Sequence, residues 1–195
     1  MIEPIVEKLI ELEGGDWMQR GPIDLYCRVF HEYGDLFHSH IDNFPIWGPA
    51  FLDEVGRGAL GEVYGLSDRH VIKLPYLKRG LYLLRELVIL LHLYENGVSV
   101  PKPEGIFKIA VNKKDRSHLR RLVNVEKAGL VMERVHGEEP YSANAIELMG
   151  VELDKCRRLG YICIDAGRSN AIYDTDHDKV YLIDFGSWML TRTIN

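Results

Sequence analysis

From residue 51 onwards, apolar and polar positions repeat in patterns that predict a series of strands and helices. Strands are predicted at 51–55, 62–66, 71–74, 106–111, 129–132, 171–173 and 180–183. A strong helical pattern covers 79–96 and ends at Gly97, and an amphipathic helix is predicted at 142–159. This order of elements is typical of an α+β fold rather than a doubly wound one.

The first 50 residues differ from the rest, with more aromatic and histidine residues and with breakers such as Gly14-Gly15 and Gly48-Pro49. Short helices are predicted at 5–12 and 24–36, the second with Asp24 as its N-cap. We therefore expect a helical N-terminal appendage at 1–50 and a main domain at 51–195. Four aromatic residues are expected to pack between the appendage and the strand-rich part: Trp17, Phe44, Trp47 and Phe51.

Composition narrows the class of protein. The chain has 195 residues, a formal net charge of −5 and 46% apolar residues, which suits one compact unit. No apolar run approaches the roughly 18 residues that a membrane span needs, and the acidic N-terminus is unlike a secretion signal. Three widely spaced cysteines indicate neither a disulfide framework nor a zinc site. We expect a cytoplasmic protein without membrane contact.

A basic stretch lies at the predicted connection between two strands, and its members are Lys113, Lys114, Arg116, Arg120, Arg121 and Lys127. Charge runs in a hairpin are usually solvated, so a solvated surface is the favoured interpretation. Contact with RNA or an acidic partner is the alternative. The acidic net charge argues against non-specific nucleic-acid binding.

The first candidate for chemistry is the glycine-rich run with Gly56, Gly58 and Gly61, followed by Val63. A dinucleotide fingerprint would open a helix, but the residues after these glycines alternate like a strand. The run is therefore predicted to join two antiparallel strands. Glycines in such a loop let backbone amides approach phosphates closely, although a plain hairpin turn is the alternative.

The second candidate is a pair, Lys73 and Glu86. Lys73 ends an apolar strand beside the glycine-rich loop, from which it could reach phosphate oxygens. On the predicted helix a polar stripe is formed by Lys78, Arg85, His92 and Asn96. Glu86 lies about 100° from that stripe, among apolar positions, where a carboxylate needs a cation unless it reaches solvent at the helix edge. We therefore predict an ion pair between Glu86 and Lys73.

Two acidic motifs complete the pattern. Asp165 precedes Asn170 by five residues, and Asp184-Phe185-Gly186 follows the last predicted strand. Phosphoryl transfer needs oxygen ligands for Mg²⁺ and a carboxylate that orients the attacking hydroxyl. Asn170 and Asp184 are candidate metal ligands, and Asp165 is the candidate carboxylate. Each motif alone is also typical of turns.

Taken in order, these motifs resemble the protein-kinase superfamily, whose signatures are GxGxxGxV, V-A-I-K, H-R-D-L-x-x-x-N and D-F-G. The resemblance covers 51–186. In its compactness the chain looks more like the Rio-type atypical kinases or the small kinase of the KEOPS complex, and Met132-Glu133-Arg134-Val135-His136-Gly137 is similar to those kinases.

The resemblance implies a two-lobed fold that binds ATP and Mg²⁺ (or Mn²⁺), with an N-lobe at about 51–132 and a reduced C-lobe at about 137–195. Gly56, Gly58, Gly61 and Val63 would cover the nucleotide. Met132, Glu133 and Val135 would hold the adenine. Lys73, Glu86 and Asp165 would be catalytic, with Asn170 and Asp184 at the metal.

The chain also departs from the family pattern. Cys163-Ile164 replaces His-Arg before Asp165, and Gly167 replaces a lysine, a charge that Arg168 could supply. Only nine residues follow Gly186, without an A-P-E motif, so a partner protein is expected to help select a protein substrate. The favoured function is a small serine/threonine protein kinase. The alternatives are a Rio-like ATPase switch, a small-molecule kinase or a partner-binding pseudokinase.

Overall fold

The computed structural model describes residues 54–58, 61–76, 80–114 and 122–190. The predicted N-terminal appendage, its two helices and its packing aromatic residues lie outside this part of the chain.

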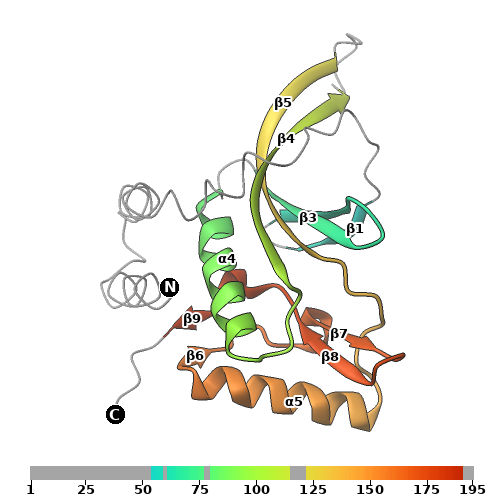
Figure 1. Cartoon of the computed structure of the whole chain (residues 1–195), viewed down its shortest axis with the longest axis vertical. Helices are drawn as coiled ribbons and strands as arrows, with labels where there is room; N and C mark the ends of the chain where they lie inside the picture. Colours follow the sequence, from blue (N-terminus) through green and yellow to red (C-terminus); the bar gives the residue numbers. More distant parts are fainter. Residues whose placement is uncertain (1–53, 59–60, 77–79, 115–121, 191–195) are drawn as a thin grey trace.

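A five-stranded antiparallel sheet forms the first half of the described chain, in the order β1-β2-β3-β5-β4 (Figure 1). Its strands are β1 (Glu54–Arg57), β2 (Gly61–Gly65), β3 (His70–Pro75), β4 (Pro103–Lys114) and β5 (Leu122–Glu133). All five correspond to predicted strands. The antiparallel sheet and the two described helices confirm a fold that combines helices with an antiparallel sheet.

The β4–β5 pair is much longer than the sequence patterns predicted. The two strands pair from Pro103 opposite Met132 to Lys114 opposite Leu122, whereas β3 pairs with β5 only from Leu130 to Glu133. Lys113, Lys114 and Lys127 therefore lie within strands, not in the connection where we expected them. Backbone pairing accepts lysine in a strand, so polar residues did not mark the strand ends.

Helix α4 (Gly80–Glu95) lies beside the sheet (Figure 1). Its residues Leu87, Leu90 and Leu93 are buried. The expectation of a polar stripe on this helix is wrong at Arg85, which is only 4% exposed. Arg85 Nη2 donates a hydrogen bond to the backbone carbonyl of Trp188, and His92 Nδ1 lies 2.6 Å from the hydroxyl of Tyr161. Arg85 and His92 therefore face the C-terminal segment, where these polar groups find partners.

The second half of the described chain consists of short elements around one helix. Ser142 accepts a hydrogen bond from the amide of Ala145 and caps α5 (Ala143–Arg158). After it follow β6 (Tyr161–Ile162), the 3₁₀ turn η2 (Arg168–Asn170), β7 (Ala171–Asp174), β8 (Lys179–Leu182), the 3₁₀ turn η3 (Phe185–Ser187) and β9 (Met189–Leu190). β7 and β8, both predicted as strands, pair with each other, whereas the pairing of β6 with β9 joins strands too short to show a sequence period.

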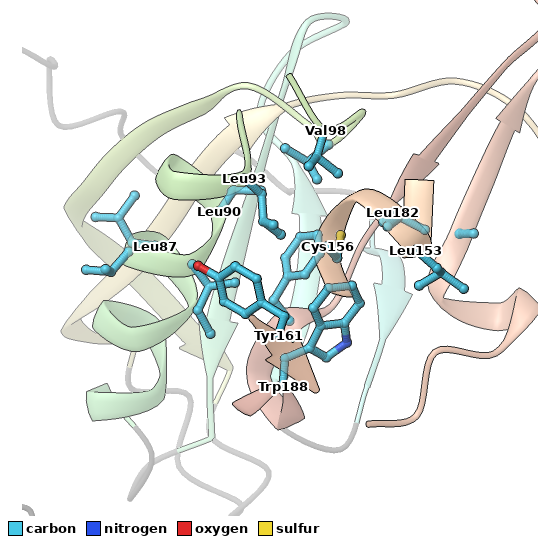
Figure 2. Close-up of a cluster of buried hydrophobic side chains, with 14 of the residues drawn as sticks. Leu87, Leu90, Leu93, Val98, Leu153, Cys156, Tyr161, Leu182 and Trp188 are labelled. Carbon is cyan, nitrogen blue, oxygen red and sulfur yellow. The ribbon is translucent and has the colours of Figure 1, made fainter. Parts of the chain in front are cut away.

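One hydrophobic core joins these halves (Figure 2). Leu87, Leu90 and Leu93 of α4 meet Leu153 and Cys156 of α5 in a single cluster, together with Tyr161, Leu182 and Trp188. The rings of Phe185 and Trp188 pack edge to face at 4.9 Å. This core fixes η3 against α4 and so positions Asp184, which immediately precedes η3. Neither of the described helices is long and apolar enough to cross a membrane.

Candidate functional site

Lys73 of β3 is the centre of a cluster of charges, in which Lys73 and Glu86 are buried and Asp184 is partly exposed. Its Nζ lies 2.7 Å from Glu86 Oε1 and 2.7 Å from Asp184 Oδ1. Lys73 is 4% exposed and Glu86 is 2% exposed. The ion pair predicted between Lys73 and Glu86 is therefore present. The direct contact between Lys73 and Asp184 was not predicted, because nothing in the sequence links residues 111 positions apart.

Burial and charge compete in this cluster. Burial raises the pKa of the Glu86 carboxyl above its ordinary value, although the attraction of Lys73 works in the opposite direction. Burial alone would lower the pKa of Lys73, but the carboxylates of Glu86 and Asp184 together raise it. Lys73 is therefore held as a cation in a place from which water is largely excluded.

Asp184 connects this cluster to the glycine-rich loop. Its backbone is left-handed (φ 58°, ψ 69°), and it immediately precedes η3, which packs on α4. While its Oδ1 contacts Lys73, a Cβ built on Gly58 would lie 3.1 Å from its Oδ2. The loop therefore lies directly over the Asp184 carboxylate, and a side chain at position 58 would crowd it.

The glycines of the loop have different roles. The amide of Gly58 donates to the carbonyl of Gly61 at 2.9 Å, which closes the turn between β1 and β2. A side chain at Gly61 would overlap the backbone carbonyl of Leu74, so this glycine is needed for the close approach of β2 to β3. A Cβ at Gly56 would make only an ordinary contact, at 3.9 Å, with Val63. Among the three glycines, Gly58 is the one that lies next to the Asp184 carboxylate.

The turn from Asp165 to Asn170 is held by hydrogen bonds to its backbone carbonyls. Asp165 is left-handed (φ 58°), and its carbonyl accepts hydrogen bonds from Gly167 N at 2.8 Å and from Asn170 Nδ2 at 2.7 Å. The amide of Ile183 donates to the carbonyl of Asn170 at 2.9 Å. This bond sets the turn beside the residue before Asp184, so the two acidic motifs are neighbours. The Asp165 carboxylate is exposed, and no residue in the described ranges forms a hydrogen bond or ion pair with it.

The residues predicted to hold adenine lie at the end of β5. Met132 pairs with Val71, two positions from the pairing of Leu130 with Lys73. Because side chains alternate along strands, Met132 lies on the same face of the sheet as Lys73, and so does Val63, which pairs with Lys73. The amide of Glu133 donates to the carbonyl of Lys102 at 2.8 Å. Val135 lies just after the strand, and its contact with a nucleotide stays a prediction.

The available oxygen atoms suit a hard cation. The side-chain N–H of Asn170 donates to the backbone carbonyl of Asp165, which leaves the side-chain oxygen of Asn170 for a ligand. Asp184 contacts Lys73 through Oδ1, so its Oδ2 can also bind a ligand. The described residues contain no group of three or more His, Cys, Asp or Glu side chains that could hold a metal by themselves. One carboxylate and one amide oxygen fit Mg²⁺, which usually binds through few protein ligands and the phosphates of a substrate.

No known protein-family model and no curated protein matches this chain. The fold does match solved structures, among them the crystal structure of a Stt7 homolog from Micromonas algae soaked with ATP. That likeness has a TM-score of 0.51 at 18% identity and covers 77% of this chain. The chain therefore shares the fold of the Stt7 homolog over most of its own length. The chain spans 57% of the Stt7 homolog's length, and the finer resemblance to Rio-type or KEOPS kinases stays a prediction, as does the division into two lobes.

Proposed function

We propose that this chain binds ATP with Mg²⁺ and transfers the γ-phosphoryl group to a serine or threonine hydroxyl of a protein. The observation that carries this proposal is Lys73, which contacts both Glu86 and Asp184 at 2.7 Å in a kinase-like fold. A fixed cation beside an acidic metal ligand is what the binding of a nucleotide phosphate and its metal ion requires.

Each residue of the cluster has a role in this proposal. Lys73 contacts the phosphate oxygens as a positive point charge, and Glu86 keeps its side chain in one orientation. Gly58 brings the loop over the phosphates, while Val63 and Met132 offer apolar contacts to the adenine from the same sheet face as Lys73. The backbone of Glu133 and Val135 supplies its polar contacts.

Asp184 and Asn170 would hold Mg²⁺ through Oδ2 and the side-chain carbonyl oxygen. When bound, the ion neutralises charge that develops on the phosphate oxygens. The hydrogen bond from Asn170 Nδ2 to the Asp165 carbonyl fixes the Asn170 side chain in the orientation that leaves this oxygen available.

Asp165 orients the acceptor hydroxyl and receives its proton. In the transfer, the bond between the γ-phosphorus and the β–γ bridging oxygen breaks, a bond from the hydroxyl oxygen to phosphorus forms, and ADP leaves. The exposed carboxylate of Asp165 can be reached by a macromolecular acceptor. A partner-binding scaffold would need none of these groups, and a buried lysine between two carboxylates is costly to desolvate.

The test measures transfer from ATP that carries a radioactive γ-phosphate, in the presence of Mg²⁺, to the chain itself and to a mixture of serine peptides. Wild type is compared with Asp165→Ala, Asp184→Ala and the control Asp176→Ala, which changes an exposed aspartate in the β7–β8 turn. Transfer should fall by roughly 10² or more in the first two variants and remain unchanged in the control.

Three outcomes would contradict the proposal in distinct ways. Release of inorganic phosphate without labelled protein or peptide would instead indicate the ATPase switch. Stabilisation of the fold by Mg-ATP without any turnover would indicate a pseudokinase or an enzyme that is inactive without a partner protein. Absence of ATP binding would exclude the kinase, the ATPase switch and a pseudokinase that binds ATP.

A further inference from the structure

Arg168 lies on the turn that also carries Asp165, but its guanidinium does not point into the buried charge cluster. Its Cζ lies 4.9 Å from the centre of the Tyr141 ring, in the geometry of a cation–π contact. Tyr141 is 64% exposed, and Arg168 is exposed as well. The pair therefore forms a platform on the outer surface beside the proposed catalytic turn.

Both members of this platform are fixed in place. The hydroxyl of Tyr141 donates to Glu139 Oε2 at 2.8 Å. The segment before it is tied to β7 by two backbone hydrogen bonds between Glu138 and Tyr173, at 3.0 and 2.7 Å, and a side chain at Gly137 would overlap the Tyr173 carbonyl. Arg168 begins η2, whose Asn170 is bonded to Asp165. The guanidinium is therefore placed at a defined position relative to Asp165.

The guanidinium also keeps its hydrogen-bonding capacity. Two other exposed arginines, Arg57 and Arg157, each form an ion pair with a carboxylate three residues away. Within the described ranges, Arg168 forms no such pair, and the nearby carboxylate of Glu139 is engaged by Tyr141. Stacking on an aromatic ring covers the face of a guanidinium and leaves its N–H edge free.

We propose that Arg168 recognises a carboxylate in the acceptor protein, close in sequence to the serine or threonine that is phosphorylated, so that the preferred substrate is an acidic peptide segment. This inference rests on the proposed function and names its substrate class. The planar N–H edge of arginine binds a carboxylate with two parallel hydrogen bonds, and the fixed distance to Asp165 converts that bond into selection of one peptide register.

The test uses a set of peptides that share one central serine and neutral flanks, with a single glutamate moved through the flanking positions. For each peptide, kcat/KM is measured with wild type, Arg168→Met and Arg168→Lys. Lys179→Met is the matched control, because Lys179 is an exposed cation that lies 4.4 Å from the ring of Tyr181 on β8. Binding of the same peptides is measured separately by fluorescence anisotropy.

Wild type and the control should prefer glutamate at one or two adjacent positions, by about tenfold in kcat/KM and in affinity. Arg168→Met should lose this preference without losing activity on the neutral peptide, and Arg168→Lys should keep only part of it because lysine lacks the planar edge.

If the neutral peptide is phosphorylated but no glutamate position is preferred, or if Arg168→Met keeps the preference, the inference is wrong while the proposed kinase activity stands. If no peptide is phosphorylated, the proposed function fails, and the anisotropy data decide the inference alone. Equal binding of acidic peptides by wild type and Arg168→Met would then overturn it.

Discussion

The buried cluster of Lys73, Glu86 and Asp184 and the exposed turn from Asp165 to Asn170 both carry residues of the proposed catalytic centre, but different forces hold them. In the cluster, two side chains that are 2–4% exposed must neutralise each other. In the turn, hydrogen bonds to the backbone carbonyl of Asp165 fix the geometry, while the Asp165 carboxylate faces solvent.

This difference determines what a substitution does. Lys73 and Glu86 are both buried, and the charge of one cannot be solvated when the other is lost, so loss of either side chain should disturb the whole fold. A group lost from the turn is replaced by water, so the fold should survive and mainly function should suffer. Stability measurements can therefore separate the two regions even before any activity is known.

The largest effect is expected for Lys73→Met. This change leaves the Glu86 carboxylate buried without its cation, and we expect a loss of about 3–5 kcal/mol in the free energy of unfolding. The measurement is urea denaturation near neutral pH. The double variant Lys73→Met/Glu86→Leu removes both charges and should recover much of this loss, because an apolar pair of similar volume is often tolerated in place of a buried ion pair.

A double-mutant cycle with Glu86→Leu completes this experiment and measures the coupling between the two side chains. If the effects of the two single changes simply add, Lys73 and Glu86 are not energetically coupled. The description of this region as a neutralised buried cluster would then be wrong.

The cluster should also give the protein a characteristic pH dependence. Because burial raises the pKa of Glu86, the folded state binds this proton more tightly than the unfolded chain does. The contribution of Glu86 to stability is therefore fully present below its unfolded pKa of about 4.3 and is lost as pH rises through the folded pKa. Wild type should gain stability relative to Glu86→Gln as the pH is lowered from 7.

The measurement is the Tm of both proteins as a function of pH, with the affinity for ATP determined in parallel. Protonation removes the charge that holds Lys73, so affinity for ATP in wild type should fall over the range in which the Tm difference grows. A Tm difference that instead grew with rising pH would show that the pKa of Glu86 is lowered, and that the ion pair outweighs burial.

The same contrast explains how much of the site the sequence could predict. Glu86 was assigned to Lys73 because a carboxylate among apolar helix positions needs a partner, and this requirement is visible in a helical projection. The same projection misled at Arg85, because it could not show that the segment around Trp188 would cover this side chain. Burial by a distant segment is a property of the tertiary structure alone.

The exposed turn could be located from the sequence but not described. The spacing of Asp165 and Asn170 marked it, whereas the stacking of Arg168 on Tyr141 depends on a ring from the segment just before α5. The strands β6 and β9 likewise escaped notice, since two residues carry no period. The strands β4 and β5 were predicted too short, because their polar residues were assigned to a loop.

Among the substitutions at the proposed site residues, the smallest effect on stability is expected for Asn170→Ala. This change removes one hydrogen bond, from Nδ2 to the Asp165 carbonyl, and water can replace it at this position, so the free energy of unfolding should fall by only about 0.5–1.5 kcal/mol. Ser169→Ala on the same turn, whose hydroxyl makes no hydrogen bond among the described residues, should change it by less than about 0.5 kcal/mol. Urea denaturation of both variants measures the difference. A loss for Asn170→Ala as large as that for Lys73→Met would mean that the turn supports the fold as strongly as the buried cluster does, and the contrast between the two regions would not hold.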